Sequence, residues 1–535
     1  MVDLSGYNNF QWILFAKPLR VCIIQISNPF QEPWMLNKRG CGVLLHPTSL
    51  PGSGGIGTFG DEARRFIDLL AKMGMSYWQV LPLTPPACGN SPYSSFSAFA
   101  GNPLLIDLEQ VIAEGDLPEG CCNRDFSEQS VDFDAVSGFK HQLLQQAGSL
   151  FLSQEVTQRK QEFWHFCDTT PWLHEFALFM SIKQGTKGKP WNKWNRDSAL
   201  LTTESYEKYS VALKLEIGIQ KYIQWQFFKQ WKSLRKYAES RGVAIIGDLP
   251  IFVAYDSADV WSHREQFLLD ETGKPTVVAG VPPDYFSKTG QLWGNPLYDW
   301  NLMRNQGYLW WINRFRSMFE LYDVVRIDHF RGFEAAWHVP ASHRTAQHGK
   351  WVSGPGADLF DAVFSDLGSL PIIAEDLGVI TAGVEELRDR YNFPGMKILQ
   401  FAFGSDSSNP YLPHNHKRNC VIYTGTHDND TSLGWCNSLS DSQRDRVVEY
   451  LGCNDDNCVP ALLRTALMSV ADTVVLPFQD LLMLDSDARM NIPGNAFGNW
   501  GWRFSWDMLA PDLAQKTGDL VERYGRQNKV IKQTS

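Results

Sequence analysis

Short apolar runs and longer amphipathic stretches alternate along most of the chain. The short runs are rich in Val, Ile and Leu, as parallel strands are when helices cover both faces of a sheet. Helical periodicity is clearest at 61–73, 215–240 and 308–321. The strand-like runs lie at 42–45, 77–81, 244–246, 324–327, 372–374, 397–401, 421–423 and 473–476. Eight such units predict an α/β protein with a (β/α)8 (TIM) barrel.

The runs are unevenly spaced, which predicts large helical insertions between strands. Trp- and Phe-rich helical stretches such as 161–178 indicate a helical insertion subdomain at about 100–235, and a loop insertion is expected at about 251–305. No Pro-, Gly- or Ser-rich linker divides the chain. We therefore predict one domain over 35–535 without a separate C-terminal β domain.

The first 34 residues form an N-terminal extension of unclear role. Their apolar stretch at 12–16 is interrupted by Lys17 and Arg20, and no segment reaches the roughly 18 apolar residues that a membrane span needs. Asp3 is the only charge ahead of that stretch, which is not the pattern of a secretory signal. The extension is expected to be an appendage or to lie upstream of a true start at Met35.

Composition narrows the classes of partner. The net charge of -10 and the lack of a Lys/Arg-rich run make nucleic acid and anionic membranes poor partners. The ten cysteines have no repeated spacing, which favours free thiols in a reducing cytosol. The 20 tryptophans favour a carbohydrate ligand, because sugars stack their apolar faces on aromatic rings.

One motif imitates a dinucleotide-binding site. Residues 52–57 read GSGGIG, which matches G-x-G-x-x-G between a strand and a helix. However, HPTSLP separates the strand from the glycines, and the next strand ends in LPLTPP without the acidic residue that would hold a ribose. We interpret the segment as a flexible βα loop and expect no cofactor.

Candidate chemistry gathers at the predicted strand ends, where βα loops build the active site of a barrel. Asp328 ends its strand two residues after Arg326, so both side chains are expected on one face. Several carboxylates around one mouth suit glycosidic bond chemistry, in which one acid protonates the leaving oxygen and another attacks the anomeric carbon. The residues at the strand ends are His46, Asp248, Asp328, Glu375, His427 and Asp428.

A divalent metal site is the main alternative for these side chains, because Asp and His also ligate metals. No His-x-His or His-x-x-x-His pair lies at the strand ends, and His414 and His416 precede a strand. Arg326 suits a nucleophile beside it, since its charge keeps Asp328 ionised. We therefore expect no metal.

Seven segments together resemble the 4-α-glucanotransferases of glycoside hydrolase family 77, which include bacterial amylomaltase and the plastid disproportionating enzyme. The resemblance extends from about residue 40 to 503. The segments are RIDHFRGF, IIAEDLG, YTGTHDNDT, GDLPIFVAYDSADVW, PPDYFSKTGQLWGNPLYDW, SPYSSFSAFAGNP and HPTSLPGSGGIGTFG.

The resemblance implies a retaining enzyme that transfers α-1,4-glucan segments through a covalent glycosyl-aspartate. It implies Asp328 as the nucleophile, Glu375 as the general acid and base, and Asp428 as the carboxylate that stabilises the transition state. Arg326 would orient Asp328, His329 and His427 would bind the sugar, and Asp248 would support the site. Further contacts implied are Tyr285, Phe286 and Trp293 in a loop over the cleft, Tyr93 at a remote glucan site, and Asn491 in the cleft.

The expected partners are malto-oligosaccharides and α-1,4-glucans, and the expected state is a monomer or homodimer. The resemblance places the chain in the cytoplasm or, alternatively, in the plastid stroma. Two other classes stay open. An α-glucan hydrolase would use the same three carboxylates, and a noncatalytic glucan-binding module would keep the aromatic residues but could dispense with the acids.

Overall fold

The computed structural model describes residues 36, 38–87, 89–283 and 287–528. Eight parallel strands form one sheet in the order β10-β11-β12-β1-β2-β3-β6-β9. The Ala374 N–H donates to the Pro394 carbonyl at 3.0 Å, which joins the two ends of the sheet. The strands are β1 (Gly40–Leu44), β2 (Tyr77–Gln79), β3 (Ala244–Pro250), β6 (Val324–Asp328), β9 (Ile372–Ala374), β10 (Gly395–Ile398), β11 (Cys420–Tyr423) and β12 (Thr473–Pro477). The predicted (β/α)8 barrel is confirmed.

The strands are buried on both faces, which explains their continuous apolar sequences. Side chains that point inward fill the barrel, among them Tyr77, Val324 and Tyr423, while the alternate residues pack beneath the surrounding helices. Gly42 permits close packing between β1 and β2, since a Cβ there would lie 2.5 Å from the Tyr77 Cβ. The interior is therefore a packed core, and the accessible functional side chains lie at the carboxyl ends of the strands.

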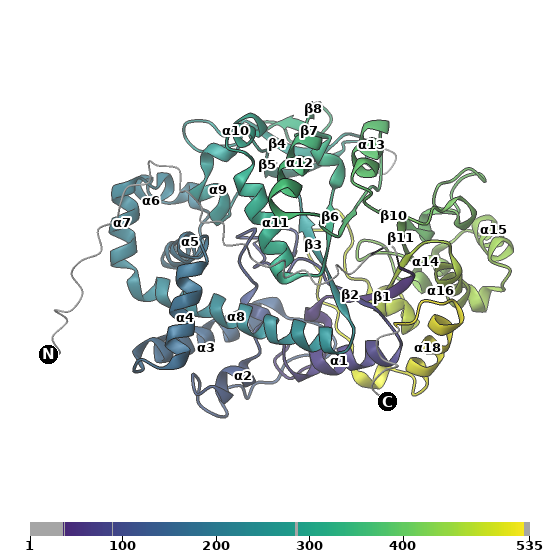
Figure 1. Ribbon diagram of the computed structural model, residues 1–535, viewed down its shortest axis with the longest axis horizontal. Helices are drawn as coiled ribbons and strands as arrows, with labels where there is room; N and C mark the ends of the chain where they lie inside the picture. The colour runs from purple at the N-terminus through teal and green to yellow at the C-terminus, as the bar shows by residue number, and fades with distance from the viewer. Residues whose placement is uncertain (1–35, 37, 88, 284–286, 529–535) are drawn as a thin grey trace. The chain divides into compact units, whose positions relative to one another are not determined.

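Helices cover the barrel from outside (Figure 1). The predicted helices appear as α1 (Asp61–Lys72), α8 (Lys214–Ser240) and α11 (Leu309–Leu321). Trp231 of α8 donates its indole N–H to the Leu321 carbonyl at 2.9 Å, which ties α8 to the end of α11.

The residues between β2 and β3 are mainly helical. They include α2 (Leu108–Ala113), α3 (Phe133–Ser153), α4 (Gln158–Thr169), α5 (Leu173–Gly185), α6 (Arg196–Leu200) and α7 (Thr203–Ala212). The helical stretch expected at 161–178 is two helices, because Pro171 cannot donate to a continuing ladder and restricts the residue before it. Phe151 of α3 packs on Tyr222 and Trp225 of α8, so aromatic contacts join α3 to α8.

A second, antiparallel sheet was not predicted. It has the order β5-β4-β7-β8, with β4 (Val277–Val281), β5 (Gln291–Pro296), β7 (Ala335–Pro340) and β8 (Lys350–Ser353). Part of the expected loop at 251–305 is thus a β-hairpin. The expected strand at 397–401 ends at Ile398, and Leu399–Phe401 form a 3-10 helix.

After β12, the described residues form α17 (Phe478–Leu481), α18 (Leu513–Arg523) and two 3-10 helices. The remaining helices of the described chain are α9 (Ala258–Ser262), α10 (Trp300–Asn305), α12 (Ala357–Leu367), α13 (Ala382–Arg390), α14 (Ser432–Ser438), α15 (Asp441–Leu451) and α16 (Cys458–Met468). None of the helices in the described ranges has both the length and the apolarity that crossing a bilayer requires.

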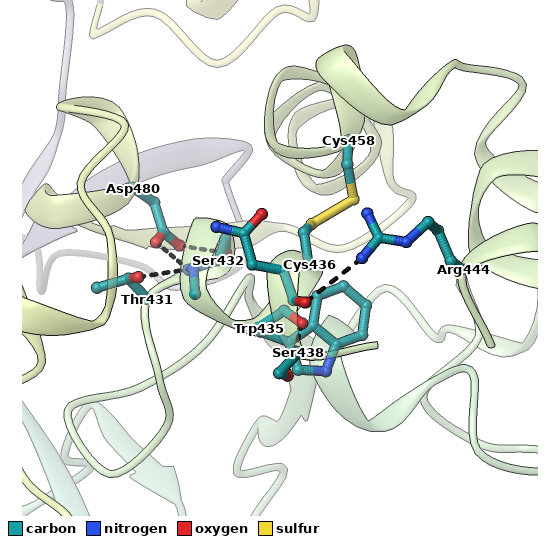
Figure 2. Close-up of a disulfide and its surroundings, with 10 residues drawn as sticks. Thr431, Ser432, Trp435, Cys436, Ser438, Arg444, Cys458 and Asp480 are labelled. Carbon is teal, nitrogen blue, oxygen red and sulfur yellow. Dashed lines mark hydrogen bonds between the residues drawn. A yellow bond between two sulfur atoms is a disulfide. The ribbon is translucent and has the colours of Figure 1, made fainter. Parts of the chain in front are cut away.

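One pair of cysteines contradicts the expectation of free thiols. Cys436 of α14 and Cys458 at the start of α16 form a disulfide, with their Cα atoms 6.8 Å apart (Figure 2). The two residues are 22 positions apart, and the intervening α15 returns the chain to α14. Because this proximity arises from tertiary folding, the cysteine spacing did not reveal it.

Candidate active site

An arginine links two carboxylates at the ends of adjacent strands. Asp248 of β3 lies opposite Arg326 of β6, and Arg326 Nη1 donates to both oxygens of Asp248 at 2.8 and 2.7 Å. Its Nη2 donates to Asp328 Oδ1 at 3.1 Å, so Arg326 and Asp328 share a face as the sequence predicts. Asp248 and Arg326 are buried, whereas the Asp328 side chain is 30% exposed. The more accessible carboxylate is therefore Asp328.

Glu375 follows β9 and is held by two backbone groups. Its Oε2 accepts from the His329 N–H at 2.7 Å, and its Oε1 accepts from the Leu377 N–H at 2.8 Å. Burial raises the pKa of Glu375 to about 7, and the nearby Asp328 carboxylate adds to the rise. Glu375 can therefore carry a proton near neutral pH beside the Asp328 side chain.

His329 has an uncommon backbone conformation for a residue with a Cβ atom. Its φ of 55° and ψ of 49° lie in the left-handed region. Such conformations persist where the surrounding structure enforces them, often at functional sites. Here the N–H is bonded to Glu375, and Phe330 donates its N–H to the Glu375 carbonyl at 3.2 Å. This turn thus couples the ends of β6 and β9.

Asp428 lies on the loop after β11. Asn491 Nδ2 donates to its Oδ1 at 2.6 Å, and Arg489 Nη2 donates to its backbone carbonyl at 2.7 Å. His427 Nε2 is 3.5 Å from the same Oδ1. The Asp428 side chain is 49% exposed, so its second oxygen can reach a ligand in the mouth of the barrel.

The loop that carries Asp428 is anchored where α14 begins. The backbone N–H and the hydroxyl of Ser432 both donate to the buried Asp480 carboxylate at 2.7 Å (Figure 2). The Thr424 hydroxyl also donates to Asp480. Because Thr424 and Ser432 flank the loop, Asp480 fixes both of its ends.

Tyr93 lies at the centre of the site, and its expected place at a remote glucan site was wrong. Its hydroxyl donates to Asp248 Oδ2 at 2.7 Å. Its ring stacks on His427, with centroids 5.1 Å apart and planes 16° apart. The segment after β2 therefore folds back over the barrel mouth, an arrangement that local sequence could not indicate.

Aromatic side chains surround the open part of the site. A cavity of about 470 Å³ is lined by Asp328, Tyr93, Trp293 and Phe252, among others. Trp293 of β5 meets the His329 ring edge to face at 4.8 Å. Burial lowers the pKa of His329 to about 4, so its imidazole is neutral at pH 7.

Two predicted contacts, Tyr285 and Phe286, lie outside the described residues. Sequence reasoning also missed Phe252 and Arg489. Phe252 follows Asp248 within the quoted GDLPIFVAYDSADVW segment, and Arg489 precedes Asn491 by two residues, so proximity to predicted residues could have identified both.

His46 lies beneath the same mouth. Burial and the nearby His427 lower its pKa to about 3, so it is neutral at pH 7. In the described part of the chain, no group of three or more His, Cys, Asp or Glu side chains is arranged to hold a metal ion.

A (β/α)8 barrel with carboxylates and an aromatic-lined cavity at its mouth defines an enzyme of glycosidic bond chemistry. The sequence profile described as 4-alpha-glucanotransferase matches residues 45–509. The chain therefore belongs to the 4-alpha-glucanotransferase family, glycoside hydrolase family 77, and the resemblance stated from the sequence is confirmed.

This chain is similar in sequence to known 4-alpha-glucanotransferases over nearly its whole length. The 4-alpha-glucanotransferase of Synechocystis sp. is 49% identical over 92% of this chain and 99% of that protein. The chloroplastic/amyloplastic enzyme of Solanum tuberosum is 44% identical over 92% of this chain and 87% of that protein. The structure of the Streptococcus agalactiae amylomaltase in complex with acarbose has a TM-score of 0.89 at 38% identity, covering 92% of this chain and 100% of that one.

Proposed function

We propose that this chain transfers α-1,4-glucan segments between malto-oligosaccharides with retention of configuration, through a covalent glycosyl-aspartate on Asp328. The observation that carries the proposal is that two carboxyl groups at the ends of adjacent strands lie in different environments. Asp328 is held by Arg326, whereas Glu375 is buried and its pKa is raised to about 7. Two carboxyl groups with such different environments suit a nucleophile and a general acid.

The reaction follows from these roles. The Glu375 proton passes to the departing glycosidic oxygen while an Asp328 oxygen attacks the anomeric carbon, which inverts that centre. The ionised Glu375 then takes the proton of an acceptor 4-hydroxyl, whose oxygen displaces Asp328 and inverts the centre again. Asp428 accepts hydrogen bonds from substrate hydroxyls, and Asp248 keeps Arg326 in place. His329, His427, Tyr93, Trp293 and Asn491 line or support the sugar site.

Maltotriose as the sole substrate separates transfer from hydrolysis. A transferase produces glucose together with longer oligomers, and the number of reducing ends stays constant because every cleavage is matched by a new bond. A hydrolase produces only shorter sugars and increases the reducing ends. A binding module produces neither. We expect an oligosaccharide ladder without a rise in reducing ends, and products no longer than maltotriose would refute the proposal.

The rate of transfer should fall as the pH rises through about 7. Only the protonated Glu375 can donate to the leaving oxygen, and its proton is lost above its pKa of about 7. We expect kcat/KM for maltotriose to decline roughly tenfold per pH unit on this limb. α-Maltosyl fluoride is the control, because fluoride departs without a proton and its kcat/KM should lack this limb. A maltotriose profile that stays flat to pH 9 would contradict the assignment.

We also propose a monomer or homodimer in the cytoplasm, with the plastid stroma as the alternative. The Solanum tuberosum relative is named chloroplastic/amyloplastic, which supports keeping the alternative. The Cys436–Cys458 disulfide is unusual for a reducing compartment. Cell fractionation decides the location, and analytical ultracentrifugation decides the oligomeric state.

A further inference from the structure

A second large cavity lies outside the barrel mouth. Its volume is about 680 Å³, and residues of α5, α9 and α11 contribute to its walls. We call it the outer groove and define it by Phe99, Trp172, Glu175, His263, Gln266 and Trp310. It shares no lining residue with the cavity beside Asp328, so it is a separate site.

Three aromatic rings form part of the outer groove. Phe99 and Trp172 are nearly parallel, with centroids 6.3 Å and planes 22° apart, and Phe99 meets Trp310 edge to face at 5.8 Å. Trp172 is half-buried, whereas Phe99 and Trp310 are buried. Trp172 is therefore the most accessible of the three rings, and it is held by contacts with Phe99, Phe176 and Phe228. A partly exposed indole that is fixed in this way is a suitable surface for the apolar C–H face of a sugar.

The cationic groups that line the outer groove are already paired within the protein. His263 Nε2 is 3.2 Å from Glu175 Oε2. Burial opposes the protonation of His263, but the Glu175 and Glu265 carboxylates raise its pKa to about 10. Arg316, which also lines the groove, is paired with Asp366. An anionic ligand would thus find no unpaired cation in the described wall, whereas a neutral polyhydroxy ligand would find donors and acceptors.

Two buried polar atoms in the wall lack hydrogen-bond partners among the described residues. They are Trp310 Nε1 and Gln266 Oε1, in residues that are 9% and 7% exposed. Gln266 Nε2 does have a partner, the Gln306 Oε1 at 2.7 Å. Both atoms are covered by the wall of the groove, so a bound molecule meets the exposed polar groups of the wall and not these two atoms.

We propose that the outer groove binds a segment of an α-glucan, with Trp172 as the stacking surface. The choice of ligand rests on the proposed function, since a polymeric substrate supplies further glucose units beyond the catalytic mouth. The position supports this role, because Ser97 borders both the outer groove and a small cavity that contains Tyr93 and Asp248. A long glucan would gain affinity from the groove, and a trisaccharide held in the catalytic mouth would not.

Trp172→Ala tests the proposal through substrate length. We expect its KM for amylose to rise about fivefold or more, since losing an aromatic contact of this kind costs that order of affinity. Its kcat and KM for maltotriose should stay within about twofold of the unsubstituted enzyme. The matched control is Trp164→Ala on α4, because Trp164 is 43% exposed and does not line the groove. An unchanged KM for amylose, or an equal loss with maltotriose, would overturn the proposal.

Calorimetry with maltoheptaose provides a readout that needs no turnover. In a Glu375→Gln background, the full chain should bind maltoheptaose at two sites, and adding Trp172→Ala should leave one. A single binding site with the same stoichiometry and affinity in both variants would refute glucan binding in the groove. If transfer fails in the maltotriose assay while Trp172 still governs one of two binding events, the groove stands and the proposed function does not.

Discussion

Asp328→Asn should lower the turnover of maltotriose by at least about 10³-fold while the barrel stays folded. The amide has nearly the same size and can still accept from Arg326 Nη2, but it cannot act as an anionic nucleophile at the anomeric carbon. Asp248 keeps its two bonds to the same guanidinium, so Arg326 is not left as an unpaired buried charge. The measurements are the initial rate and the thermal unfolding midpoint of purified protein.

Asp361→Asn is a matched control for this substitution. Asp361 also pairs with an arginine, Arg390 at 2.8 Å, but its side chain is 53% exposed on the outside of the barrel. It should leave turnover within about twofold, as surface substitutions remote from a site usually do. Near-normal turnover of Asp328→Asn would show that this carboxylate is not the nucleophile.

The stereochemistry of rescue tests the same role independently. In Asp328→Ala, azide can enter the vacated space and displace fluoride from α-maltosyl fluoride. One displacement inverts the anomeric carbon, so the expected product is β-maltosyl azide. An α-azide would require two displacements, the first by another protein group and the second by azide. It would therefore assign the nucleophile to a residue other than Asp328.

The barrel could be predicted from sequence because its strands are buried on both faces. Runs such as Val324–Asp328 have no polar face to confuse the pattern, and the residue at each carboxyl end must then lie at one mouth. The same reasoning located Asp328 and Glu375. Period-two alternation also predicted that Arg326 and Asp328 share a face.

Contacts between segments that are distant in the sequence could not be predicted from these local patterns. Tyr93 is 155 residues from Asp248, and only the folded chain shows that its hydroxyl reaches that carboxylate. The antiparallel sheet was missed because β5 is exposed over most of its length and its pattern is not that of a core strand. The outer groove depends on helices from separate parts of the chain, so its residues had no common motif.

The surroundings of Glu375 fit the proposal that one glutamate acts as acid and then as base. Its burial and the nearby Asp328 favour the protonated form, whereas the Arg326 guanidinium and the N–H groups of Leu377 and His329 favour the carboxylate. These opposing effects leave the pKa at about 7, where either form is accessible. In the proposed mechanism, the left-handed turn at His329 contributes to this balance, because it supplies one of the two N–H groups.

Glu375→Gln should reduce the turnover of maltotriose by at least about 10³-fold, because glutamine cannot protonate the leaving oxygen. It should still react once with α-maltosyl fluoride, whose leaving group needs no proton. We expect a burst of one fluoride per chain, followed by slow release, because the variant also lacks the base that activates the acceptor hydroxyl. Intact-protein mass spectrometry should detect the trapped maltosyl group, and peptide mapping should place it on Asp328.

Glu385→Gln controls for the loss of a carboxylate in the same region. Glu385 lies on the exposed side of α13, the helix that follows β9 and Glu375, and its replacement should leave turnover within about twofold. Azide added to Glu375→Ala with α-maltosyl fluoride should give the α-azide, since azide then attacks the glycosyl-enzyme and completes a second inversion. Opposite anomers from Asp328→Ala and Glu375→Ala would separate nucleophile from acid and base. The same anomer from both would refute the division of roles, because a single displacement cannot retain configuration.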